Sequence, residues 1–79
     1  MKLTYDPRYN IAYLAFQEKT VQVETIHVSD QVNVDLAPDG TLYGIELLNA
    51  NEQLGIETDP TVHVVNEARG EASELPLAI

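Results

Sequence analysis

The 79-residue sequence predicts a mainly β fold with one short helix, in which about five strands form a small antiparallel meander sheet. Short apolar runs rich in aromatic and β-branched residues are separated by turn residues along most of the chain. The turn Pro38-Asp39-Gly40 lies between two such runs, which is a strong signal for a β-hairpin. Asn49 and Gly55 are residues that typically begin and end a helix, so a short helix is expected between them, through Leu54.

The first two strands are expected at residues 2–5 and 11–16, joined by a turn at residues 6–10. Pro7 presets φ for that turn. Both alternating faces of residues 11–16 are apolar, which predicts a strand buried on both sides in the middle of the sheet. A helix is the alternative for so short an apolar run, but the aromatic residues and the flanking turns favour a strand.

The third expected strand, residues 21–28, changes its alternation part of the way along. Its apolar residues stand at odd positions up to Val23 and at even positions from Ile26. Because side chains of a strand alternate between faces, this change predicts a bulge or break near Glu24 and Thr25.

The remaining strands are expected at residues 32–36 and 41–48, on either side of the hairpin turn, and at residues 61–65. Residues 1–66 would then form a single β-rich domain. Residues 67–79 are rich in Glu and contain Gly and Pro, so they are expected to be a flexible acidic tail.

A three-residue loop with Gly40 in the left-handed conformation is the most natural form of the hairpin turn. It would place Ala37 opposite Thr41 and Val34 opposite Gly44. Apolar residues would then lie on both faces of the hairpin, and a domain of this size can cover only one of them. A four-residue loop would shift the register, leave one clean polar face and weaken the argument for association.

In the three-residue register, the second apolar face carries Tyr43, Ile45 and Leu47, beside Asn33 and Asp35. Covering a few such side chains contributes several kcal/mol at about 25 cal/mol per Å². That is comparable to the whole stability expected of a small domain. We therefore expect Tyr43, Ile45 and Leu47 to form an interface, with a second copy or with another protein.

The chain is strongly acidic, with thirteen Asp and Glu residues against four Lys and Arg and a formal net charge of −9. No basic stripe exists to neutralise phosphates, which argues against nucleic-acid binding, and an anionic membrane surface would repel the chain. No apolar run approaches the length of a membrane span and no signal peptide is recognised, so a cytoplasmic location is expected. The charge either keeps the protein soluble or steers it onto a basic partner.

Cysteine is absent, which excludes disulfides and thiolate metal sites, and two histidines argue against a structural metal. No cofactor is expected. Small domains without such links gain stability by oligomerisation, so a homo-oligomer, first of all a dimer, is expected.

Several polar residues are candidate sites. His27 could pair with Asp30 or Asp35 for acid–base chemistry, although a solvent-facing strand histidine is the simpler interpretation, and the same holds for His63. Asp30, Asp35 and Asp39 recur along the hairpin but lack the dense loop of a calcium site. No catalytic residue and no metal ligand is therefore assigned.

Glu46 is the most interesting single residue, because it lies between Ile45 and Leu47 in an otherwise apolar strand. It could meet a cation on a partner, act as a catalytic carboxylate, or simply face solvent beside a Lys or Arg. No nucleophile–base pattern and no Gly-rich phosphate loop occurs, so we expect the protein not to be an enzyme. A small-ligand-binding or enzymatic domain that uses a carboxylate near Glu46 is the alternative.

Five segments carry a family resemblance in chain order: Tyr5-Asp6-Pro7, Ile11-Ala12-Tyr13-Leu14, Val28-Ser29-Asp30, Val32-Asn33-Val34-Asp35 and residues 39–50. From about residue 1 to residue 54 the chain resembles the prokaryotic domain-of-unknown-function 2283 family. Asn10 stands where that family usually has an acid, and Asn49-Ala50-Asn51 where Asp-Ala-Ser is usual.

The resemblance implies a small antiparallel β fold with no established activity or catalytic residues. Some members are encoded beside small basic toxin-like proteins, so it also implies an antitoxin-like role as one option. Together with the charge, this predicts a non-enzymatic protein-interaction module that self-associates or binds a small basic protein.

Overall fold

The computed structural model describes residues 1–18 and 20–78. It confirms the mainly β fold with one short helix and an antiparallel five-stranded sheet. In chain order, the elements of this described part are β1 (Lys2–Asp6), β2 (Ile11–Ala15), β3 (Glu24–Ser29), β4 (Val32–Leu36), β5 (Leu42–Leu48), α1 (Ala50–Leu54), β6 (Thr61–Asn66) and β7 (Glu71–Pro76).

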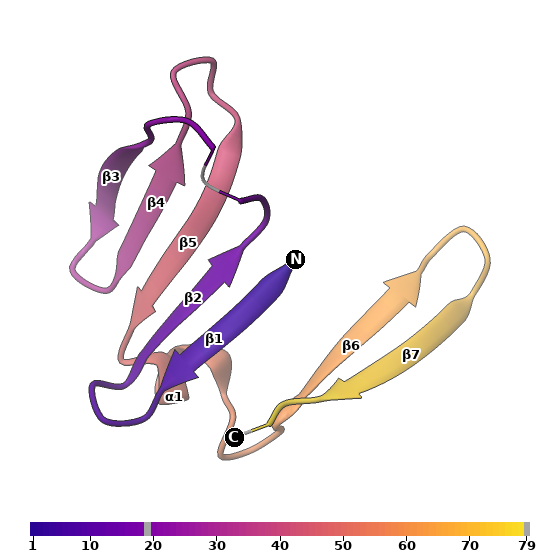
Figure 1. Cartoon of the computed structure of the whole chain (residues 1–79). Helices are drawn as coiled ribbons and strands as arrows, with labels where there is room; N and C mark the ends of the chain where they lie inside the picture. Colours follow the sequence, from indigo (N-terminus) through magenta and orange to yellow (C-terminus); the bar gives the residue numbers. More distant parts are fainter. Residues whose placement is uncertain (19, 79) are drawn as a thin grey trace.

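The strands form two separate sheets (Figure 1). The larger sheet has the order β1-β2-β5-β4-β3, and every neighbouring pair is antiparallel. β2 lies between β1 and β5, so it is an interior strand as expected, although β5 is the middle strand of the sheet. The expected burial on both sides was wrong, because Ala12 is the one buried residue of β2. β6 and β7 pair only with each other and form a hairpin that extends away from the larger sheet (Figure 1).

The hairpin turn between β4 and β5 has the expected three-residue loop. The backbone N–H of Ala37 donates to the carbonyl of Thr41 at 2.9 Å, and Gly40 has a φ of 88°. The Asp39 side chain accepts a further hydrogen bond from the Thr41 N–H at 2.9 Å. These two hydrogen bonds and the left-handed glycine form the loop that the sequence predicts.

The register beyond the turn differs from the expected one. Leu36 pairs with Leu42, but the next pair is Asp35 with Gly44, which leaves Tyr43 as an extra residue on β5. Val34 therefore lies opposite Ile45 and not opposite Gly44, so the predicted register was wrong along most of the hairpin. The reason is a β-bulge, which inserts one residue on one strand and shifts all later pairs by one.

This register sorts the side chains of the sheet by polarity, because directly paired residues share a face. One face carries two apolar rows, which we call the apolar face: Leu3, Leu14, Ile45, Val34 and Ile26, and then Tyr5, Ala12, Leu47 and Val32. The opposite face, which we call the polar face, carries Thr4, Tyr13, Glu46, Asn33 and His27, and then Lys2, Ala15, Gly44, Asp35 and Thr25. The result is close to the polar face expected from a four-residue loop, produced instead by a bulge, although the apolar pair Ile11 and Leu48 also lies on it, at the end of the sheet near the helix.

β3 is shorter than the expected strand at residues 21–28. It begins at Glu24, and its irregularity lies between His27 and Ser29. Of the two alternatives expected near Glu24 and Thr25, the break is present, because the strand begins at Glu24, whereas the bulge lies elsewhere. The change of alternation follows from this break, because residues 21–23 lie outside the strand and their valines do not need to match its faces.

β7 lies inside the stretch that was expected to be a flexible tail. Residues 71–76 pair with β6 across a turn in which Gly70 has a φ of 67°. The Asn66 side chain accepts hydrogen bonds from the backbone N–H groups of Ala68 and Arg69 and so supports this turn. The strand was missed because four of its six residues are polar or Pro. The last residue of the expected tail, Ile79, lies outside the described residues.

The helix spans Ala50–Leu54 and ends at Gly55, which is left-handed, as predicted. Its N-terminus differs from the expectation. Asn49 is itself left-handed, with a φ of 52°, and its side chain makes no capping hydrogen bond. Asn10, from the turn between β1 and β2, supplies the cap, because its Oδ1 accepts the Asn51 N–H at 2.9 Å.

Asn10 links the turn between β1 and β2 to the start of the helix that follows β5. Its Nδ2 donates to Asn51 Oδ1 at 2.6 Å, its Oδ1 accepts the Tyr5 hydroxyl at 3.1 Å, and its backbone carbonyl accepts the Ala50 N–H at 3.0 Å. Its own φ is 54°, a conformation that asparagine adopts more readily than other non-glycine residues.

We expect Asn10→Ala to lower the free energy of unfolding by about 2–3 kcal/mol, because it removes several side-chain hydrogen bonds and strains a left-handed residue. Asn10→Gly keeps the backbone relaxed and loses only the side chain, so its cost should be smaller. Urea denaturation at a fixed protein concentration measures both. Equal stability of the two variants would show that the left-handed backbone contributes nothing.

Candidate functional site

The apolar face has little cover in the described part of the chain. No large side chain there is fully buried, and the buried apolar residues are Ala12, Ala37, Tyr43, Ala50 and Ile56. Apart from Ala12, every residue of the apolar face keeps part of its surface exposed. The helix lies at one end of the sheet, where its main contacts are with β5 (Figure 1). Within the described residues, the sheet therefore has no second layer.

Two of the three residues expected to form an interface lie on this face. Ile45 and Leu47 are half-buried members of the apolar face, whereas Tyr43 is only 8% exposed. Leu14, Val34 and Ile26 belong to the same surface, although they were not predicted as interface residues. Their alternation was visible in each strand, but placing them together required the correct register.

The polar face contains a buried carboxylate, Asp35, which is 7% exposed. The Tyr13 hydroxyl donates to its Oδ2 at 2.6 Å, and the Thr25 hydroxyl donates to its Oδ1 at 2.6 Å. These hydrogen bonds connect β2, β3 and β4 and offset the cost of burying the charge.

Tyr13 reaches Asp35 by lying across Gly44 of the intervening strand. A Cβ atom at position 44 would overlap with the hydroxyl and ring of Tyr13. Glycine is therefore required here for the close approach of an aromatic side chain.

Glu46 lies on the polar face, so it points away from the apolar face and cannot meet a partner there. Asn33 Nδ2 donates to Glu46 Oε1 at 3.0 Å, and His27 Nδ1 lies 2.8 Å from Asn33 Oδ1. His27 Nε2 is 3.9 Å from Asp30 Oδ1. The structure thus joins His27 to Glu46 through Asn33. The His27 side chain is 67% exposed, which agrees with the simpler interpretation of a solvent-facing strand histidine.

An open depression of about 400 Å³ lies over this part of the sheet. It is lined by Tyr13, Thr25, Asn33, Asp35 and Glu46. Its polar groups bind one another across the strands, an arrangement suited to holding the sheet together.

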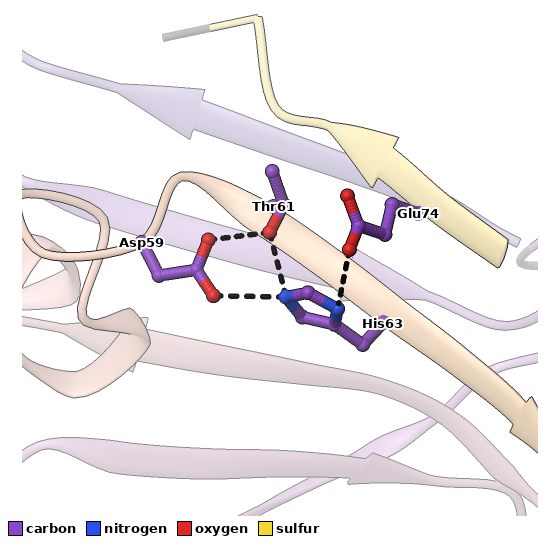
Figure 2. Close-up of polar contacts among 4 residues, drawn as sticks. All are labelled: Asp59, Thr61, His63 and Glu74. Atoms are coloured by element: carbon purple, nitrogen blue, oxygen red, sulfur yellow. Dashed lines mark hydrogen bonds and ion pairs between the residues drawn. The ribbon is translucent and has the colours of Figure 1, made fainter. Parts of the chain in front are cut away.

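A second polar cluster lies at the base of the β6–β7 hairpin (Figure 2). His63 Nε2 is 2.9 Å from Asp59 Oδ2, and His63 Nδ1 is 3.4 Å from Glu74 Oε1. The Thr61 hydroxyl donates to Asp59 and lies 2.9 Å from His63 Nε2. Figure 2 shows the imidazole between the two carboxylates, so its protonated form is favoured.

The pKa values of this cluster follow from that geometry. The hydrogen bond from His63 to the Asp59 carboxylate raises the pKa of His63 above its ordinary value, and the charges of Asp59 and Glu74 act in the same direction. The Thr61 hydroxyl, followed by His63, lowers the pKa of Asp59. All of these groups are exposed to solvent, which limits their contribution to stability.

In the described part of the chain, no three His, Asp or Glu side chains are grouped in a way that could hold a metal ion. Among the same residues, no helix has the length and apolar character needed to cross a bilayer.

We expect Gly44→Ala to cost about 1–3 kcal/mol of unfolding free energy, because the new methyl group displaces Tyr13 from Asp35 and leaves a buried carboxylate short of a donor. In a Tyr13→Ala background the same substitution should be nearly neutral. Urea denaturation of the four proteins of this double-mutant cycle checks the coupling. An equal cost of Gly44→Ala in both backgrounds would contradict it.

The raised pKa of His63 predicts a pH dependence of the hairpin. Protonated His63 stabilises the hairpin fully below the ordinary histidine pKa of about 6.5, and this contribution is lost as the pH rises through the raised value. NMR titration should place the His63 transition above that of the same residue in an Asp59→Asn variant. Identical titration curves in the two proteins would show that Asp59 does not act on His63.

Comparison with known proteins gives one match. A model of a family described as a protein of unknown function (DUF2283) matches residues 2–51, which covers β1 to β5 and the start of the helix. Searches of curated proteins and of solved structures returned no significant match. Since the family model covers well over half of the chain, the protein belongs to the DUF2283 family of proteins of unknown function.

Proposed function

We propose that this protein is a non-enzymatic protein-interaction module that self-associates through the apolar face of its sheet. The observation that carries the proposal is the polarity of that sheet. One row of apolar side chains crosses all five strands and a second crosses four of them before it reaches Ser29 on β3. All but one of these apolar residues keep part of their surface exposed. Ile26 is 40% exposed and most of the other members are half-buried, so the face is a contiguous apolar surface that is only partly covered, and such surfaces are typical of interaction sites.

The exposed area of the chain supports the same function. The chain exposes 5933 Å², whereas a compact monomer of its mass exposes about 4,800 Å². The surplus of about 1,100 Å² exceeds the roughly 800 Å² that each partner contributes to a standard interface. The radius of gyration is 14.1 Å, against about 11.6 Å for a compact domain of this length. A single partner of the same size is enough to cover this surplus of exposed area.

The polar face supports a non-enzymatic role. Each carboxylate oxygen of Asp35 accepts a hydrogen bond from a hydroxyl group, and Glu46 is held by Asn33. These groups serve cross-strand contacts, and the depression above them is open to solvent. A catalytic carboxylate near Glu46 would have to give up these contacts in order to act.

The net charge of −9 favours a basic protein as the second candidate partner. Acidic residues would steer such a partner, and the apolar face would supply the buried contact area. This is the antitoxin-like version of the same binding function.

A pair of lysine variants tests the proposal. Ile26 and His27 are neighbours on the edge strand β3, but Ile26 lies on the apolar face and His27 on the polar face. We expect Ile26→Lys to raise the dimer Kd by roughly tenfold or more, because an unpaired ammonium group would be buried in the interface. His27→Lys should change the Kd by no more than about twofold. Sedimentation equilibrium measures both, and circular dichroism checks that each variant folds.

A wild-type chain that remains monomeric at several hundred micromolar would overturn self-association. If such a monomer forms a salt-sensitive complex with a Lys- and Arg-rich protein encoded beside it, the binding function belongs to that basic partner. Equal weakening by both lysine variants would indicate that charge alone, and not the apolar face, controls association.

A further inference from the structure

The β6–β7 hairpin has an apolar face of its own. Its register pairs Val62 with Leu75 and Val64 with Ser73 on one side, and His63 with Glu74 on the other. Val62, Val64 and Leu75 are 41%, 49% and 55% exposed. The hairpin therefore presents Val62, Val64 and Leu75 to solvent on one side, with the polar pair Asn66 and Glu71 at its outer end. Its other side carries the His63 cluster near the base (Figure 2) and Val65 beside Ala72 further out.

Such a hairpin lacks support within its own chain. Isolated two-stranded hairpins are at best marginally stable in water, because too few side chains are buried to offset the loss of conformational entropy. The main contacts of β6 and β7 are with each other, and Figure 1 shows the hairpin extending away from the five-stranded sheet. Its six-residue strands need an outside surface to pack against.

The base of the hairpin is held beside the apolar face. The Leu77 N–H donates to the Pro60 carbonyl at 2.7 Å, which extends the pairing past β7. Pro76, Leu77 and Ala78 line a shallow pocket together with Leu3 and Tyr5, two members of the apolar face on β1. The hairpin thus starts at the edge of the apolar face and projects outward from it.

We propose that the hairpin packs on the apolar face of a second copy, and that the two copies exchange hairpins reciprocally. This inference rests on the proposed self-association and names the segment that covers the face. The surplus exposed area of about 1,100 Å² per chain is what an exchange of this kind needs, because each chain would bury both its hairpin and its sheet face.

The dimensions of the two surfaces agree. A six-residue strand is about 20 Å long, and five strands at about 4.8 Å spacing span about 19 Å. A hairpin laid across the partner's sheet therefore reaches all five strands. Two-fold symmetry makes the contact self-complementary, so it closes as a dimer and does not continue into a fibre.

Neighbouring valines on opposite sides of β6 test the exchange. Val64 lies on the apolar side of the hairpin and is 49% exposed, whereas Val65 pairs with Ala72 on the other side and is 58% exposed. We expect Val64→Lys to raise the dimer Kd by roughly tenfold or more, and Val65→Lys to change it by no more than about twofold. Sedimentation equilibrium of the full chain measures both.

Cross-linking gives a second measurement that does not depend on loss of binding. The chain has no cysteine, so Val64→Cys and Ile26→Cys chains can be mixed and treated with a short bismaleimide. Exchange predicts a mixed product that links hairpin to sheet, and a much lower yield when Val65→Cys replaces Val64→Cys.

The outcomes separate the two proposals. If Ile26→Lys dissociates the dimer and Val64→Lys does not, or if the cross-linked product joins Ile26→Cys chains only to each other, the exchange is wrong and self-association through the sheet stands. If the wild-type chain is a monomer, both proposals fail.

Discussion

A one-residue bulge at Tyr43 determines the chemistry of both faces of the sheet. Because side chains alternate along a strand with a period of two, a shift of one residue moves every later side chain to the other face relative to its neighbour. With the bulge, Ile45 lies beside Val34 and Leu47 beside Val32. Without it, the same residues would lie among Asn33 and Asp35, and neither face would be uniform.

The two faces differ in whether their side chains find partners within the chain, namely hydrogen bonds for the polar face and apolar cover for the apolar face. On the polar face, Asp35 and Glu46 already have hydrogen-bond partners on neighbouring strands. On the apolar face, no second layer is present, because the only helix of the described residues is five residues long and lies at one end of the sheet. Burial of that face by another surface is therefore the main source of stability that the folded chain leaves unused.

Three asparagines that are far apart in the sequence meet in the structure. Asn10, Asn49 and Asn51 come from two distant turns, yet Asn10 Nδ2 lies within hydrogen-bond distance of the side-chain oxygens of both others. An amide can donate and accept at once, whereas a carboxylate at position 10 could only accept. The three asparagines thus form one matched set that fastens the β1–β2 turn to the start of the helix.

Local signals in the sequence were sufficient for the fold class, the β4–β5 turn and the end of the helix. Each depends on residues within a few positions of one another, such as Gly40 in the turn and Gly55 after the helix. Glu46 was also recognised as unusual from its apolar neighbours alone. The same reasoning missed β7, since a strand made mostly of polar residues has no local signal that distinguishes it from a tail.

Long-range pairing decided the rest. The cap of the helix comes from Asn10, about forty residues away along the chain, and the partners of Asp35 come from β2 and β3. Gly44, next to Tyr43, is a residue type that often marks a bulge, but the shift of register that sorts the two faces is defined only by the pairing of β5 with β4. Composition and turn residues act locally, whereas register, caps and buried polar contacts exist only once strands from different parts of the chain lie side by side.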